Sequence, residues 1–101
     1  MSLSSQPLSI SARVLKPSTI EAVRRSPSFH LRGWQILDRW ALDSPRELKS
    51  LEAQGIVLLL GRLLEQQELE HRTLLEALGQ PQWQGMAEHE ILQQQEVRTS
   101  L

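Results

Sequence analysis

The segment with the strongest suggestion of chemistry is Glu68-Leu69-Glu70-His71, because Glu68 and His71 have the Glu-x-x-His spacing. Residues three apart lie on one turn of an α-helix, and helical bundles that hold two iron ions use this pair of carboxylate and imidazole. Such sites also need carboxylates from facing helices, where the preceding helix offers only Asp38, which we expect to face outward. A metal-binding helical bundle is therefore the least favoured function, and we expect no metal and no cofactor. His71 is better interpreted as a histidine in a helical seam, hydrogen-bonded to Gln67 or to its symmetry mate.

Catalysis by a nucleophile or by an acid and base pair has no support in the sequence. No serine lies in a Gly-x-Ser-x-Gly turn, and no glycine-rich loop could hold a phosphate. Acidic and basic residues alternate as ordinary helix pairs, for example Glu68 with Arg72. We therefore expect a protein that is not an enzyme.

The composition is that of an ordinary globular chain, with 101 residues, 40% of them apolar and 23% charged. A single small domain of this length buries about two thirds of its unfolded surface, so a large extra apolar face suggests a partner. The chain contains no cysteine, which excludes disulfides and fits a reducing compartment. The first residues lack the features of a secretory signal, and the uncharged run at residues 53–61 is too short to span a bilayer. We expect a cytoplasmic protein without a membrane anchor.

Charge is unevenly distributed along the chain. Residues 1–39 contain six basic and two acidic side chains, whereas residues 40–101 contain five basic and ten acidic ones. The basic part could attract nucleic acid or an acidic protein, or opposite halves of neighbouring copies could attract each other. The predicted partner-binding surface consists of Arg24, Arg25, Arg32, Gln35 and Arg39.

The elements that must position these side chains are predicted from hydrophobic spacing, beginning with a flexible or extended N-terminal arm over residues 1–17. Apolar and polar residues alternate from Leu8 to Leu15, which is the period of a half-buried strand. A single strand has no sheet to join. The segment is therefore expected to lie extended on a helical core or, as an alternative, to pair with its twin across a dimer.

The predicted helical core covers residues 18–79 and begins with two helices. Ser18 and Glu21 have the spacing of a capping box, which predicts a short helix from Thr19 to just before Pro27. A second helix is expected from about residue 28 to residue 42, with one apolar face and one polar, basic face.

A third, long helix is predicted over residues 45–78, because Ser44 and Pro45 favour a helix start and Gly79 a stop. The helix over 28–42 is too short to cover its apolar stripe, so the sequence predicts a helical hairpin packed as a homodimeric bundle. The alternative is a monomeric three-helix bundle in which the long helix breaks near Gly55 or Gly61. The predicted oligomer seam consists of Ile56, Val57, Leu60, Leu63, Leu64, Gln67, His71, Leu74, Leu75 and Leu78.

Residues 80–101 are predicted to form a C-terminal tail with one short helix between Met86 and Val97, while Trp83 folds back over the end of the long helix. Taken together, these features favour an all-α, non-catalytic interaction or regulatory protein that self-associates and binds another macromolecule. A dimeric nucleic-acid-binding regulator is the alternative, because the basic residues cluster in the N-terminal third.

Overall fold

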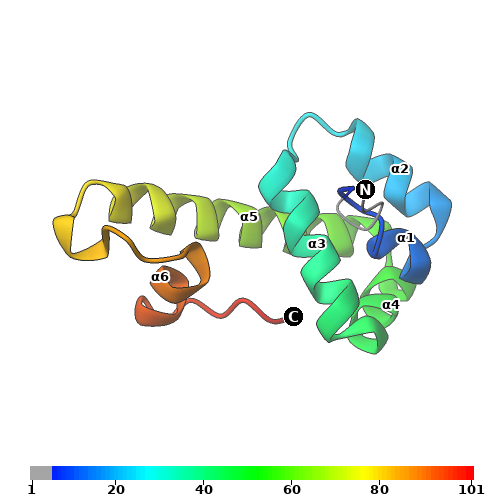
Figure 1. Ribbon diagram of the computed structural model, residues 1–101. Helices are drawn as coiled ribbons and strands as arrows, with labels where there is room; N and C mark the ends of the chain where they lie inside the picture. The colour runs from blue at the N-terminus through cyan, green and yellow to red at the C-terminus, as the bar shows by residue number, and fades with distance from the viewer. Residues whose placement is uncertain (1–5) are drawn as a thin grey trace.

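The computed structural model describes residues 6–101 and is built from helices (Figure 1). The α-helices are α1 (Ser11–Val14), α2 (Pro17–Arg25), α3 (Leu31–Asp43), α4 (Pro45–Gln54), α5 (Ile56–Leu78) and α6 (Glu88–Gln94), and a short 3-10 helix, η2 (Pro81–Trp83), precedes α6. No strand occurs among these residues. The prediction of an all-α fold is confirmed.

The helix that begins at Pro45 is interrupted at Gly55, so the predicted continuous helix over residues 45–78 is wrong. Gly55 has φ 144° and ψ 140°, a backbone conformation that side-chain-bearing residues rarely adopt, and it separates α4 from α5. The second glycine, Gly61, lies within α5 and does not interrupt it. The interruption therefore lies at Gly55, one of the two positions named in the alternative prediction. The predicted start after Ser44 and stop at Gly79 are confirmed.

The predicted extended segment from Leu8 to Leu15 is also wrong, because it folds into a turn followed by α1. Asp38 of α3 is the cause: its carboxylate accepts hydrogen bonds from the backbone N–H groups of Leu8 (2.8 Å) and Ser11 (2.9 Å), and from the Ser11 hydroxyl. Asp38 thus faces the core. The prediction that it faces outward is wrong. Residues 1–5 of the predicted arm lie outside the described part of the chain.

A second carboxylate, that of Glu52 in α4, fixes the start of α2. Its Oε2 accepts hydrogen bonds from the Lys16 backbone N–H (2.8 Å) and the Thr19 hydroxyl (2.6 Å). The helix begins at Pro17, two residues before the predicted start. The reason is that the Glu52 carboxylate accepts the backbone N–H of Lys16, the N-cap residue.

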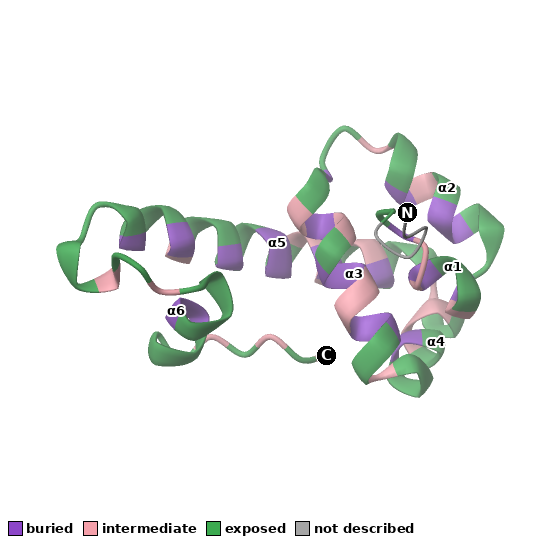
Figure 2. Ribbon diagram, in the orientation of Figure 1, coloured by how far each residue is buried: buried purple, intermediate pink, exposed green. Residues whose placement is uncertain are grey.

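The buried side chains form two separate clusters along α5 (Figure 2). The larger cluster lies where α1, α2, α3 and α4 surround the first half of α5, and it includes the fully buried Trp40, Leu48 and Leu63. The smaller one packs α6 and Trp83 against the second half of α5, through Leu74, Ala77, Ile91 and Leu92. The prediction that Trp83 folds back over the end of the long helix is confirmed, and α5 is the element shared by both clusters.

Gly33 of α3 lies directly against the Gln67 side chain of α5. A Cβ atom there would overlap Oε1 of Gln67 and lie 3.2 Å from Cδ1 of Phe29. The Gln67 side chain bridges the crossing, since its Nε2 donates to the Ser28 carbonyl (2.9 Å) and its Oε1 accepts from the His30 backbone N–H (3.2 Å).

No helix in the described range, residues 6–101, has both the length and the apolar character needed to cross a membrane.

Candidate interaction site

A network of side-chain hydrogen bonds holds the C-terminal segment, residues 98–101. This segment runs back from α6 toward α3 and α4 (Figure 1). The Thr99 carbonyl accepts hydrogen bonds from Arg39 Nε (3.1 Å), Arg39 Nη2 (2.8 Å) and Trp40 Nε1 (3.0 Å). The Arg98 carbonyl accepts one from Gln66 Nε2 (2.7 Å). We call these three donors, Arg39, Trp40 and Gln66, the carbonyl clamp.

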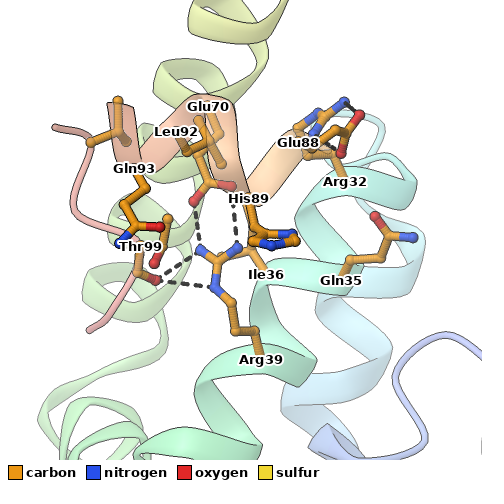
Figure 3. A pocket seen from close by; sticks show the side chains of 11 residues that line it. Arg32, Gln35, Ile36, Arg39, Glu70, Glu88, His89, Leu92, Gln93 and Thr99 are labelled. Atoms are coloured by element: carbon orange, nitrogen blue, oxygen red, sulfur yellow. Dashed lines mark hydrogen bonds and ion pairs between the residues drawn. The ribbon is translucent and has the colours of Figure 1, made fainter. Parts of the chain in front are cut away.

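Glu70 of α5 positions two of the clamp residues, with its carboxylate facing the Arg39 guanidinium (Figure 3). This carboxylate is 2% exposed and receives Arg39 Nη1 on Oε1 (3.2 Å) and Arg39 Nη2 on Oε2 (2.5 Å). Gln66 Nε2 also donates to its Oε2 (2.6 Å). A buried carboxylate is tolerated only when its charge is paired and its oxygens are hydrogen-bonded, and Arg39 and Gln66 meet both needs.

Arg62 also belongs to this network, because it contacts both Trp40 and Gln66. Its guanidinium lies 5.0 Å from the centroid of the Trp40 ring, and its Nη1 donates to Gln66 Oε1 (2.8 Å). The Trp40 ring is fully buried. Each clamp residue therefore has a further partner that fixes its orientation, so the donors are preorganised for a main-chain carbonyl.

The last residue of the segment, Leu101, packs against the larger cluster at one end of an open groove between α4 and α5. The groove has a volume of about 620 Å³, and Leu51, Val57 and Leu58 supply its apolar lining. Val57 is 79% exposed and Leu58 is 53% exposed. Leu101 thus lines an apolar groove in which Val57 and Leu58 are exposed.

Three of the five predicted partner-binding residues, Arg32, Gln35 and Arg39, lie together on α3 and line one cleft of about 560 Å³ with residues of α6 (Figure 3). Arg32 pairs with Glu88 of α6 (3.2 Å), and Arg39 with Glu70. The face of α3 predicted to be free is therefore largely covered. Residue spacing could not predict this cover, because α6 lies more than forty residues away along the chain.

The other two predicted partner-binding residues, Arg24 and Arg25, are exposed in the last turn of α2 and do not line that cleft. Arg25 pairs with Glu21 on the same helix (2.7 Å). The predicted surface is thus divided between two places on the molecule.

The predicted oligomer seam is divided as well. Its middle is covered within the chain, where Leu63, Gln67 and Leu74 are buried and Leu60 and Leu64 pack against the larger cluster. Its ends are exposed, and these comprise Ile56 and Val57 at the start of α5 and His71, Leu75 and Leu78 toward its end.

His71 does not hydrogen-bond to Gln67 within the chain, where Gln67 instead binds Ser28 and His30. The His71 ring makes an edge contact with the His30 ring, with 5.4 Å between centroids. Throughout residues 6–101, no three His, Asp or Glu side chains come close enough to hold a metal ion. Within residues 6–101 of one chain, the Glu68 and His71 pair therefore has no third ligand beside it.

Sequence reasoning missed Gln66, Glu70 and the Thr99 carbonyl. A signal for the first two was present, because Leu59, Leu63, Gln66, Glu70, Leu74 and Ala77 follow the three and four residue spacing of a buried helix face. A glutamate at such a position indicates a buried partner. The role of Thr99 has no side-chain signal, since its backbone makes the contact.

Comparison of the chain with protein-family models, with curated proteins and with solved structures finds no match. The site must therefore be interpreted from its own geometry.

Proposed function

We propose that the protein is a non-catalytic, cytoplasmic helical interaction module that self-associates and binds another macromolecule. The observation that carries the proposal is the exposure of large apolar side chains at both ends of α5. Val57 is 79% exposed and Leu78 is 77% exposed, although the chain buries two clusters elsewhere. Clustered apolar side chains of this size on a surface favour association with another polypeptide.

These exposed residues lie in two apolar depressions rather than singly. Val57 and Leu58 line the groove between α4 and α5, while Leu75 and Leu78 line a cleft of about 440 Å³ with Trp83. Concave apolar sites accommodate side chains of a partner, and aromatic residues contribute strongly to such interfaces. Both depressions include residues of the predicted oligomer seam, which supports a second copy as one partner.

The nucleic-acid alternative loses support because most of the predicted basic surface is neutralised within the chain. Arg25, Arg32 and Arg39 each pair with a carboxylate. Binding a phosphate backbone would require these pairs to be broken, and electrostatic binding weakens with each cation that is already paired. Arg24 and Gln35 remain exposed and belong to the proposed surface for the second macromolecule.

The test is the molar mass in solution, measured by light scattering behind a sizing column over a concentration series. We expect at least twice the 11.6 kDa of one chain, and a shift toward one chain for Val57→Glu and Leu78→Glu. Leu42→Glu is the matched control, because Leu42 is 68% exposed but lines neither depression. A mass of one chain at every concentration, or an equal effect of Leu42→Glu, would contradict self-association through α5.

A further inference from the structure

Charge is separated along the length of α5. Residues 6–62, which form α1 to α4 and the first turns of α5, contain nine basic and five acidic side chains, a formal net charge of +4. Residues 63–101 contain two basic and seven acidic side chains, a formal net charge of −5. The four-helix end and the α6 end lie at opposite ends of α5 (Figure 1). A parallel second copy would set like charges against each other, whereas an antiparallel copy would set each end against its opposite.

The exposed face of α5 has an apolar side chain near each end. Val57 and Leu75 lie 18 residues apart, which is five full turns, so their side chains leave the helix in the same direction. Val57 is 79% exposed and Leu75 is 54% exposed. Between them on this face, Gly61 and Arg72 are exposed as well. The two apolar residues are therefore about 27 Å apart on one face that a second helix can contact.

These two apolar residues belong to different depressions. Val57, Gly61 and Glu65 line the groove between α4 and α5, whereas Leu75 lines the cleft that includes Trp83. In an antiparallel pair with Val57 of each copy opposite Leu75 of the other, the groove of one copy faces the cleft of the other. A two-fold axis repeats this contact, so one arrangement covers both depressions of both copies.

The same register brings two charged side chains together. Neither Glu65 nor Arg72 has an ion-pair partner within residues 6–101. Arg72 of one copy comes opposite the Gly61 region of the other, where no heavy atom lies within 4 Å of the place of a Cβ. Side chains on a helix lean toward its N-terminus, so in an antiparallel pair Arg72 leans toward Glu65 of the other copy, and Glu65 leans back toward it. The absence of a side chain at Gly61 leaves room for the arginine to cross.

We propose that two copies pair antiparallel along α5, with Val57 of each copy against Leu75 of the other and Arg72 of each paired with Glu65 of the other. The proposal rests on the self-association proposed above and specifies its mode. Two apolar contacts and two ion pairs form about one two-fold axis, and each basic end lies beside an acidic end. The arrangement closes at two copies.

Directed disulfides test the register, because the chain has no cysteine. We would mix Val57→Cys and Leu75→Cys chains in reducing buffer, oxidise the mixture with diamide and identify covalent dimers by intact mass. The expected product is the mixed dimer, because a disulfide requires Cα atoms within about 7 Å. Val57→Cys alone should give almost none, since its two copies are about 27 Å apart in the antiparallel pair. Leu42→Cys mixed with Leu75→Cys is the matched control and should give no mixed dimer, because Leu42 is exposed but lies on α3.

A charge swap tests the ion pair while both apolar residues stay in place. Arg72→Glu should raise the dissociation constant of the dimer about tenfold, because two attractions become two repulsions. Arg72→Glu combined with Glu65→Arg should restore dimerisation, because the pair forms again with its charges exchanged. Circular dichroism checks that each variant keeps its helices. A double variant as weak as Arg72→Glu alone would overturn the contact, and this result decides the matter if a cysteine variant loses its dimeric mass.

The remaining outcomes separate the pairing from self-association. A native dimer whose variants give Val57→Cys homodimers, or no mixed disulfide, would overturn antiparallel pairing and leave self-association intact. A mass that grows beyond two chains with concentration would overturn the closed pair. A mass of one chain at every concentration would overturn both.

Discussion

Arg39 of α3 and Glu70 of α5 form a two-point ion pair across the helix crossing, with Nη1 and Nη2 of the guanidinium each facing one carboxylate oxygen. Glu70 is almost fully buried, whereas the Arg39 side chain is 30% exposed. The arginine therefore shields the carboxylate from solvent and, with the same group, binds the C-terminal segment. Reversal of charge at Arg39 would therefore disrupt a structural ion pair rather than test a free partner surface.

Removing the positive charge of Arg39 should destabilise the fold. We expect Arg39→Ala to lower the free energy of unfolding by about 3–5 kcal/mol, because Glu70 is left buried without a charged partner. Urea denaturation followed by circular dichroism measures this loss. Arg25→Ala is the matched control, since its pair with Glu21 is exposed, and it should leave stability nearly unchanged. If Arg39→Met with Glu70→Met is no more stable than Arg39→Ala alone, the explanation by an unpaired charge is refuted.

The two glycines flanking the start of α5 should respond oppositely to alanine. Gly55→Ala places a side chain at φ 144° and should lower the free energy of unfolding by about 1–3 kcal/mol. Gly61→Ala lies within a helix with open space around the new Cβ and should raise it by about 0.5–1 kcal/mol. Thermal melting of dilute protein compares the pair. Stabilisation by both substitutions would mean that α4 and α5 form one continuous helix.

The crossing of α3 and α5 should not accept a side chain at Gly33. Gly33→Ala displaces Gln67 and should cost about 1–3 kcal/mol, through the lost hydrogen bonds to Ser28 and His30. Urea denaturation of the two single variants and of the double variant Gly33→Ala with Gln67→Ala gives the interaction free energy between the two positions. Because the double variant removes the overlapping atoms, it should be about as stable as Gln67→Ala alone. Fully additive losses would contradict this packing.

The N-terminal turn should depend on the Asp38 carboxylate. In Asp38→Asn one of the two acceptor oxygens becomes a donor, which faces the N–H group of either Leu8 or Ser11, so we expect a loss of about 1–2 kcal/mol. Amide signals of residues 8–15 should lose protection from hydrogen exchange before those of α5. Asp43→Asn, exposed at the end of α3, should leave both measurements nearly unchanged. Equal effects of the two substitutions would exclude this role for Asp38.

The spacing of apolar residues was sufficient to predict helices, several of their ends and the all-α class. It failed at Leu8–Leu15, where alternation mimics a strand, because the acceptor that folds the segment is Asp38, about thirty residues away. A break at Gly55 was only the alternative prediction, because no proline, asparagine or serine marks a loop there. A single glycine at positive φ makes the turn without any other signal.

The candidate site was harder to predict than the fold. The expected stripe included Val57, Leu75 and Leu78 because these residues are apolar, but they are exposed in α5, whose buried face contains Gln66 and Glu70. Gln66 and Glu70 lie on the buried face, where Glu70 accepts from Arg39 and Gln66, and Gln66 also donates to the backbone carbonyl of Arg98 in the C-terminal segment. Contacts to a main-chain atom leave no mark on residue type, and a pattern of side chains cannot predict them.

The division of the apolar residues into two clusters has a consequence for how the molecule opens. Apart from α5, α6 is connected to the four-helix end by the exposed Arg32–Glu88 pair and by the C-terminal segment, in which Val97 packs with the one cluster and Leu101 with the other. Two parts joined in this way open as separate cooperative units whenever the connection is released. Release of the segment therefore lets the α6 end of the molecule unfold and refold while the four-helix end persists, so that one small chain has two stabilities rather than one.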